Sequence, residues 1–295
     1  MTSERKSHTA LDVPGRKVPI GMVQSTLTSP CAEEGTYFAG SYHIQERVGV
    51  GRLSQVYSAH DINRDGERVA LKVLSPRLTV EPHQLKRTMR DLYALMNLKS
   101  PHLVQILDVG IQNRMVYYSM EYASGSTLAE TLDRGELEIP LATRYLLHLC
   151  RAVLAAHQCQ VVHREVKLSN IFINKRDILQ LGDIGTECHM RNQSLENTHY
   201  IAPELWLGGL STQASDVYAV GVVAYRMFTD RMPFVATDAT QMAMKHVKLA
   251  AKPLRHYSPN LPEWLADLVA LMLHKNPESR PTVQDLLHRF LAQRQ

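Results

Sequence analysis

Two segments near the start of the chain carry residues whose types suit the binding of phosphate. Gly49 and Gly51 lie between two strand-like stretches, where the absence of Cβ atoms lets backbone N–H groups approach phosphate oxygens. About twenty residues later, Lys72 lies within the apolar strand-like stretch 68–74. A lysine on a buried strand is rarely left without a partner, so Lys72 requires an anion. Glycine turns also occur in ordinary hairpins, and on these residues alone that alternative stays open.

Three further polar motifs follow in the second half of the chain. Residues 163–170 read His-Arg-Glu-Val-Lys-Leu-Ser-Asn, residues 183–185 read Asp-Ile-Gly, and residues 202–204 read Ala-Pro-Glu. Core packing does not call for buried polar side chains such as those of Asn170 and Asp183. These two residues are therefore candidates for a functional site.

The elements that must position these residues change in character along the chain. Strand-like stretches in the first third cover residues 42–48, 55–60, 68–74, 104–109 and 115–121. One helix is predicted among them, beginning at Pro82, with apolar residues at helical spacing at Leu85, Met89, Leu92 and Met96.

Helical patterns dominate beyond Gly125. The first apolar stripe is Tyr145, Leu149, Val153 and Ala156, and later ones include Leu265, Leu268, Met272 and Leu286. Strands followed by helices predict an α+β fold in two lobes, joined near residues 121–125.

The composition is that of a globular protein of ordinary charge. Of the 295 residues, 44% are hydrophobic, which is enough to bury a core. The net charge of +4, from 33 basic and 29 acidic residues, is too small an excess to indicate nucleic-acid binding. The longest apolar run, residues 217–225, is far shorter than the ~20 residues that span a bilayer. We therefore expect no nucleic-acid partner, no membrane span and a cytoplasmic location.

Residues 1–41 differ from the rest of the chain because they show no periodic apolar spacing. They are rich in Ser and Thr and carry prolines at 14, 19 and 30. This pattern predicts a disordered N-terminal tail, with a docking or regulatory arm as the alternative.

Taken together, the motifs at 49–56, 69–72, 163–170, 183–185 and 202–204 resemble those of the eukaryotic-type (Hanks-type) serine/threonine protein kinase domain in order and spacing. The resemblance runs from about residue 42 to residue 290. It implies a kinase-like domain at 42–292, with an antiparallel β-sheet N-lobe at 42–121 that holds one helix. A hinge at about 121–125 and a mainly helical C-lobe at 126–292 follow.

The resemblance also implies roles for individual residues. Lys72 would hold the α and β phosphates of ATP, and Asn170 and Asp183 would hold Mg²⁺. Glu165 takes the position of the catalytic aspartate, and Lys167, two residues later, indicates the serine/threonine variant. The other implied ATP-binding residues are Val48, Gly49, Gly51, Val56, Ala70, Met120, Glu121, Ala123 and Phe172. The implied structural residues are Arg164, Asp216 in a central buried helix, and Glu204 paired with Arg280.

Four positions depart from the family pattern. Glu165 replaces the catalytic aspartate, and Asp91 replaces the helix glutamate that pairs with the strand lysine, here Lys72. Asn197 replaces a threonine that contacts the catalytic loop, and Ser54 replaces the third glycine.

Geometry matters more than basicity at Glu165. The ordinary pKa values of Asp and Glu differ by only about 0.4, so their basicity is nearly equal. The extra methylene moves the carboxylate by about 1.5 Å, and a 1 Å misplacement can cost roughly 100-fold in rate. Asp91 has the opposite error, being one methylene short of Lys72. These departures predict retained Mg-ATP binding and slow phosphate transfer to protein Ser or Thr, which a Glu165→Asp reversion should speed up.

Two other functions are compatible with the same motifs. A pseudokinase scaffold would bind ATP and regulate a partner protein without catalysis. A small-molecule phosphotransferase is disfavoured, because residues 183–204 resemble the activation segment that precedes peptide-binding helices in protein kinases.

Overall fold

The structure, a computed structural model, describes residues 10–13, 16–19, 32–51, 53–76, 82–184 and 194–293. Contacts between Cα atoms divide the chain into two compact units. The first comprises Met1–Asn97 and Ile106–Tyr122, and the second comprises Leu98–Gln105 and Ala123–Gln295. Gly185 of the predicted motifs lies outside the described residues, as does most of the predicted tail.

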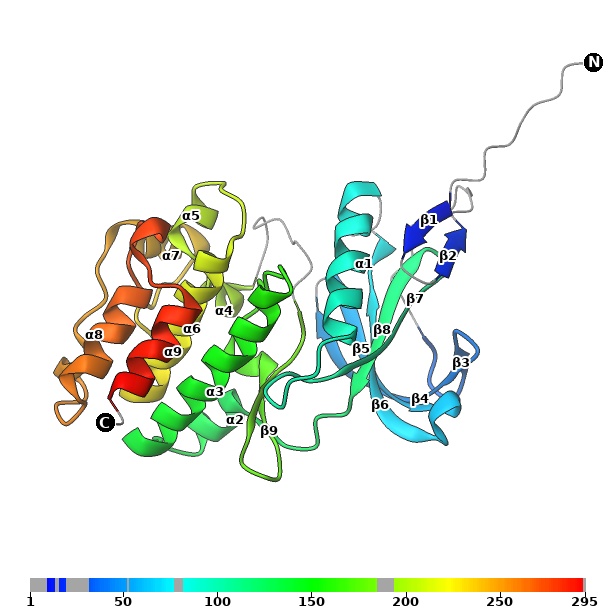
Figure 1. Ribbon diagram of the computed structural model, residues 1–295, viewed down its shortest axis with the longest axis horizontal. Helices are drawn as coiled ribbons and strands as arrows, with labels where there is room; N and C mark the ends of the chain where they lie inside the picture. The colour runs from blue at the N-terminus through cyan, green and yellow to red at the C-terminus, as the bar shows by residue number, and fades with distance from the viewer. Residues whose placement is uncertain are drawn as a thin grey trace, which may run out of the picture. The chain divides into compact units, whose positions relative to one another are not determined.

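The first unit is built on a six-stranded antiparallel sheet in the order β3-β4-β5-β6-β8-β7 (Figure 1). All five predicted strands are present within it. The bounds of the six strands are β3 Tyr37–Phe38, β4 Tyr42–Gly51, β5 Ser54–Asp61, β6 Glu67–Leu74, β7 Ile106–Gln112 and β8 Met115–Glu121.

The packed part of this unit begins before residue 42. Strand β3 pairs with β4, and Phe38 is buried in a core with Tyr42, Ile44 and Tyr57. Strand β3 therefore packs on this unit from within the segment 1–41, where a two-residue strand is too short to show alternation. Further upstream, β1 (Ala10–Val13) and β2 (Arg16–Pro19) pair antiparallel within the segment predicted to be disordered.

The single α-helix described in this unit is α1, Pro82–Met96, at the predicted position. It contacts β7, and Met89, Leu92 and Leu95 are its buried apolar residues. Asp91 is buried beside them.

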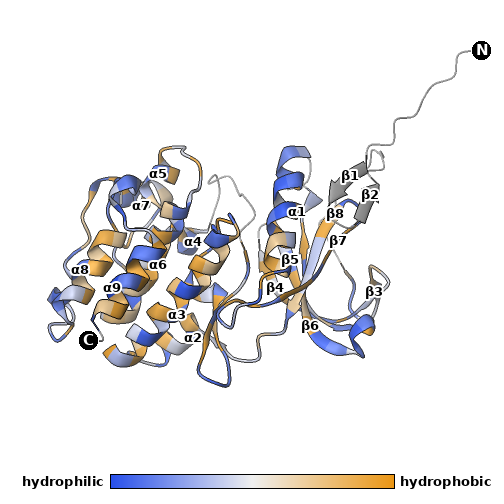
Figure 2. Ribbon diagram, in the orientation of Figure 1, coloured by the Kyte–Doolittle hydropathy of each residue, from blue (hydrophilic) through white to orange (hydrophobic). Residues whose placement is uncertain are grey.

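The second unit is mainly helical. Its helices are α2 Leu128–Asp133, α3 Ile139–Gln158, α4 Leu195–Thr198, α5 Pro203–Trp206, α6 Gln213–Thr229, α7 Ala239–Lys248, α8 Glu263–Met272 and α9 Val283–Ala292. Helix α3 packs against α6 and α9, and the predicted stripe on α3 is buried in the core they form. Figure 2 shows hydrophobic and hydrophilic residues on α3 and α9, as expected of amphipathic core helices. The predicted α+β fold class, with a sheet unit holding one helix and a mainly helical unit, is confirmed.

A small sheet in the second unit was not predicted. Its order is β11-β10-β9, with β9 Ser126–Thr127, β10 Ile171–Ile173 and β11 Leu179–Leu181. The segment Leu98–Gln105 joins this unit because the Val104 N–H donates to the Leu181 carbonyl and the Leu181 N–H donates to the His102 carbonyl. Strand β10 begins directly after Asn170, and β11 ends two residues before Asp183.

Among the described residues, α3 is long and apolar enough to cross a membrane by length and composition. Half of its 18-residue window is buried inside the protein, and core helices meet the same criterion. Its buried side chains, such as Leu149 and Val153, already have partners in the core of the second unit.

Gly125, just before β9, provides a test of this packing. A Cβ atom built on Gly125 would lie 1.7 Å from the Ile173 carbonyl oxygen in β10. We expect Gly125→Ala to destabilise the protein by more than about 3 kcal/mol, since a backbone atom cannot move aside as a side chain can. Urea unfolding measures this. Gly49→Ala is the control, because its Cβ would come no closer than 3.6 Å to Val56; equal stability losses in both variants would contradict the packing.

Candidate active site

The strand register of the first unit gathers several predicted ATP-binding residues on one face of the sheet. Val56 pairs with Lys72, and Ala70 pairs with Met120. Paired residues point to the same side of a sheet, and residues two apart on one strand share that side. Lys72, Val56, Ala70 and Met120 therefore share a face, opposite the core that contains Leu71. Lys72 is 7% exposed, so its amine is largely removed from water.

The glycine segment lies where β4 and β5 meet. Gly49 pairs with Val56 and Gly51 pairs with Ser54. A Cβ on Gly51 would lie 2.9 Å from the Ser54 hydroxyl oxygen, so the serine at the third-glycine position leaves little room there. Val48, on the same strand, is exposed.

Asp91 is buried on α1, with 2% of its surface exposed. Its carboxylate accepts hydrogen bonds from Arg90, at 2.7 Å from Nη2 and 3.1 Å from Nε. The arginine side chain is itself 65% exposed. A neighbour on the same helix therefore supplies positive charge to the Asp91 carboxylate.

In the second unit, Asp216 of α6 fixes the loop that carries Glu165. Its carboxylate accepts from the backbone N–H of His163 at 2.7 Å and of Arg164 at 2.8 Å. His157, at the end of α3, donates to it through Nε2 at 2.9 Å. Arg164 has a φ of 68°, a conformation that costs free energy in a non-glycine residue and that these bonds hold in place.

His163 lies next to this carboxylate and is almost fully buried. Burial lowers the pKa of His163, although the negative charges of Asp216, Asp183 and Glu165 oppose this effect.

Lys167 and Glu165 form an ion pair in the loop. Lys167 Nζ lies 2.8 Å from Glu165 Oε2, and the Asn170 side-chain amide donates to the Glu165 carbonyl at 2.9 Å. Asn170 belongs to the 3₁₀ turn η3, Leu168–Asn170. The carboxylate is thus held at its tip by Lys167, and its backbone is held by Asn170.

Asn170 and Asp183 offer oxygen atoms that fit Mg²⁺. The Gly182 N–H donates to the Asn170 carbonyl at 2.9 Å, which ties the residue before Asp183 to Asn170. The Asn170 amide nitrogen donates to the Glu165 carbonyl, so the side-chain oxygen of Asn170 is the group available to a cation. Within the described ranges, no three His, Cys, Asp or Glu side chains gather around a metal position. One carboxylate and one amide agree with Mg²⁺, which takes its other ligands from phosphates and water.

The predicted ATP-binding residues of the second unit are Phe172 and Ala123. Phe172 lies on β10 between Asn170 and Asp183, and a Cβ built on Gly182 would lie 3.0 Å from its ring. Ala123 precedes β9, which pairs with Phe172 through Thr127. Both residues are half-buried.

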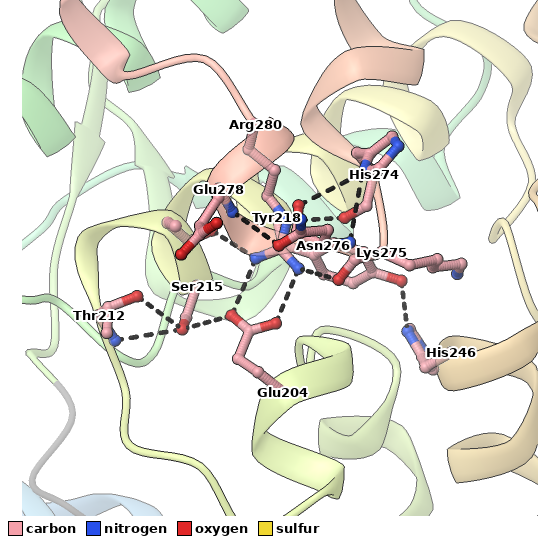
Figure 3. A network of polar contacts seen from close by, with 11 residues as sticks. Glu204, Thr212, Ser215, Tyr218, His246, His274, Lys275, Asn276, Glu278 and Arg280 are labelled. Atoms are coloured by element: carbon pink, nitrogen blue, oxygen red, sulfur yellow. Dashed lines mark hydrogen bonds and ion pairs between the residues drawn. The ribbon is translucent and has the colours of Figure 1, made fainter.

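Glu204 and Arg280 form the ion pair that the resemblance implies (Figure 3). Arg280 uses all five of its N–H donors, two of them on the Glu204 carboxylate at 2.7 and 2.8 Å. The other three serve backbone carbonyls of Ala214, His274 and Lys275. Ser215 adds a hydrogen bond to Glu204 at 2.7 Å.

The sequence did not reveal three of these contacts. His157 on Asp216 and Ser215 on Glu204 lie in helices whose apolar pattern gives no signal for a polar contact. Asn197 was recognised only as a departure from the family, yet its side-chain oxygen accepts a hydrogen bond from Lys167 Nζ at 3.2 Å.

The Glu204–Arg280 pair makes stability depend on pH. Burial alone would raise the pKa of Glu204, but hydrogen bonds from Arg280 and Ser215 lower it below its usual value. A lowered folded-state pKa adds stability above the ordinary carboxyl pKa, and this stability is lost as the pH falls through the folded value. We expect Glu204→Gln to cost about 3 kcal/mol at pH 7 and less below about pH 4. Urea unfolding at both pH values measures the difference; a difference that does not depend on pH would contradict the expectation.

The comparisons with known proteins agree with this arrangement. A family model described as "Protein kinase domain" matches residues 42–291. The serine/threonine-protein kinase PrkC of Bacillus subtilis is 31% identical over 261 residues, which cover 85% of this chain and 40% of PrkC. The serine/threonine-protein kinase PknA of Mycobacterium tuberculosis is 33% identical over 259 residues, which cover 83% of this chain and 59% of PknA.

A solved structure shows the same fold. The PknI kinase domain of Mycobacterium tuberculosis, in a mutant form, matches with a TM-score of 0.72 and 22% identity, over 90% of this chain and all of that one. The chain thus spans between 40 and 59% of the length of the two curated relatives and the whole of a kinase domain. With the family model matching most of its length, the chain belongs to the protein kinase family.

Proposed function

We propose that the protein is a serine/threonine protein kinase that transfers the γ-phosphate of Mg-ATP to hydroxyl groups of a protein substrate. The observation that carries this proposal is the ion pair between Glu165 and Lys167, at 2.8 Å, on a loop fixed by Asp216. A longer acid on a mobile loop would be a poor base, whereas here both its backbone and its carboxylate are held. The names of the two curated relatives support the same activity and give no support to a pseudokinase.

Each residue has a distinct task in the proposed reaction. The Glu165 carboxylate accepts the proton of the attacking serine or threonine hydroxyl, and Lys167 keeps that carboxylate oriented. Lys72, on the sheet face that also carries Val56 and Ala70, binds phosphate oxygens. Asn170 and Asp183 would hold Mg²⁺, which neutralises charge on the phosphates when bound.

Protein kinases gain most of their rate from the positioning of reacting groups and from stabilisation of charge. The departures at Glu165 and Asp91 keep a carboxylate at each position, so their main effect is on where that carboxylate lies. Glu165 carries the same carboxylate group as an aspartate and differs from it in having a side chain that is one methylene longer. Asp91 is buried and already accepts two hydrogen bonds from Arg90. Binding of nucleotide therefore depends less on the departures than turnover does.

Binding of Mg-ATP should raise the melting temperature. A ligand present at about 100 times its Kd adds about 2.7 kcal/mol, or roughly 5 °C for a chain of this size. We expect Lys72→Met to remove this shift and Lys175→Met to keep it, because Lys175 is an exposed lysine outside the site. Differential scanning fluorimetry measures both. Equal shifts in the two variants would contradict the role of Lys72.

Transfer of phosphate should be detectable with radiolabelled ATP and casein or histone as acceptors. Acid hydrolysis of the product should release phosphoserine or phosphothreonine and no phosphotyrosine. Glu165→Gln should lower kcat by at least about 100-fold with little change in the KM for ATP, because a general base acts on the acceptor. If the unchanged protein binds Mg-ATP but transfers no phosphate to any acceptor, the proposed kinase activity is wrong.

A further inference from the structure

A cavity of about 620 Å³ lies beside the first half of α3, where this helix meets α8 and α9 (Figure 1). Its apolar lining comes from Leu141 and Leu147 of α3, Trp264 of α8 and Phe290 of α9. The rings of Trp264 and Phe290 meet edge to face, with centroids 5.7 Å apart. Leu147 and Phe290 are buried, whereas Leu141 and Trp264 are half-buried. The cavity therefore has a well-packed apolar floor and a size within the ~300–1,000 Å³ of ligand sites.

The charged groups that line this cavity leave one carboxylate without a positive partner. Arg144 forms an ion pair with Asp177, which also accepts a hydrogen bond from the Tyr145 hydroxyl. Glu138, directly before α3, is exposed. Its side chain forms no ion pair or hydrogen bond with any residue that the structure describes. The Glu138 carboxylate is therefore available to a cation from outside.

A second hollow, of about 310 Å³, adjoins the cavity, because Glu138 lines both. Its other acidic lining residues are Glu136 and Asp230. Asp230 forms an ion pair with Arg226 of α6. Glu136 is exposed and, within the described ranges, has no side-chain partner. Two carboxylates without a counter-ion thus lie next to the apolar cavity.

The sign of the charge on the two hollows restricts what can bind them. Arg231 and Lys252 lie over the ring of Tyr257, which lines the second hollow, but neither of them lines it. The lining residues include one arginine, Arg144, against four acids, Glu136, Glu138, Asp177 and Asp230. A negative lining repels nucleic acids and anionic membrane surfaces and attracts a positively charged ligand.

We propose that the two hollows form one docking groove for a peptide segment of a partner protein, with apolar side chains in the larger hollow and Arg or Lys on Glu136 and Glu138. Two adjoining hollows of unlike character suit a peptide, because a chain can place a different side chain in each. The groove is separate from the proposed chemistry. From Leu141 to His157, which contacts Asp216, α3 rises about 24 Å. Docking therefore does not depend on the kinase activity, and the two can be tested apart.

Fluorescence anisotropy with synthetic peptides tests the groove. The probe is a dye-labelled peptide of three arginines, two glycines and two leucines, made in this order and in the reverse order. We expect at least one order to bind the full chain with a Kd in the micromolar range at low salt. Glutamates in place of the arginines should abolish binding. Glycines in place of the leucines should raise the Kd at least about tenfold, because the leucine side chains are buried in the larger hollow.

Variants of the protein locate the binding. Glu138→Lys should raise the Kd at least about tenfold, since an attraction at both hollows becomes a repulsion. Glu67→Lys is the matched control, because it makes the same change of charge at an exposed residue that lines neither hollow, and its Kd should not change. Trp264→Ala should weaken binding by a similar factor to Glu138→Lys, with urea unfolding to show that it is folded. Glu138 is exposed, so Glu138→Lys decides the test even where Trp264→Ala does not fold.

The outcomes separate docking from catalysis. Absence of binding by both peptide orders, equal binding of the glutamate peptide, or an unchanged Kd in Glu138→Lys would each overturn the docking groove. Self-association of the unchanged protein that Glu138→Lys abolishes in sedimentation would assign the groove to a second copy and overturn the partner segment. Peptide binding by a protein that transfers no phosphate would overturn the kinase activity and support the groove.

Discussion

The buried carboxylate of Asp216 is the constraint on which the geometry of the second unit depends. A buried charge is costly unless hydrogen bonds satisfy it, and three donors do so here. Two of them are consecutive backbone N–H groups, of His163 and Arg164, and the third is the His157 ring. Because consecutive N–H groups point to one carboxylate, Arg164 adopts a positive φ, and the chain enters Glu165 in a fixed direction.

The Glu204–Arg280 pair plays a corresponding part for the segment that follows the undescribed residues 185–193. Arg280 joins α5 to the start of α6 and to the turn before α9 through its five donors. Helix α6 therefore carries Asp216 on one side and contacts this ion pair through Ser215. The loop with Glu165 is bound to α6 through Asp216, and the segment that follows Asn197 is bound to α6 through Glu204 and Ser215. Lys167 can therefore contact both Glu165 and Asn197.

Much of this could be predicted from the sequence, since motifs and periodic patterns depend on local residue order. The strands, α1 and the stripe on α3 are of this kind, whereas the Glu204–Arg280 pair was predicted from the resemblance to protein kinases. The grouping of residues 98–105 with the second unit could not be predicted, because it depends on backbone hydrogen bonds with Leu181, far along the chain. Strands of two or three residues, such as β3 and β10, are too short to show a period. The contact of Asn197 with Lys167 depends on reach in space, which residue types alone do not give.

Where hydrogen bonds fix the backbone, a substitution changes the position of the nearest flexible side chain. Asp216 and Asn170 bind the backbone around Glu165, so the loop cannot move to accommodate an extra methylene without losing those bonds. Lys167, with its flexible stem, can move at little cost, and the position of its ammonium is then set by the acceptors it meets. The longer acid at position 165 is therefore accommodated by Lys167, whose ammonium contacts both Glu165 Oε2 and Asn197 Oδ1. The departures at Glu165 and Asn197 therefore act on the same ammonium, because the fixed backbone confines the adjustment to the side chains of Glu165, Lys167 and Asn197.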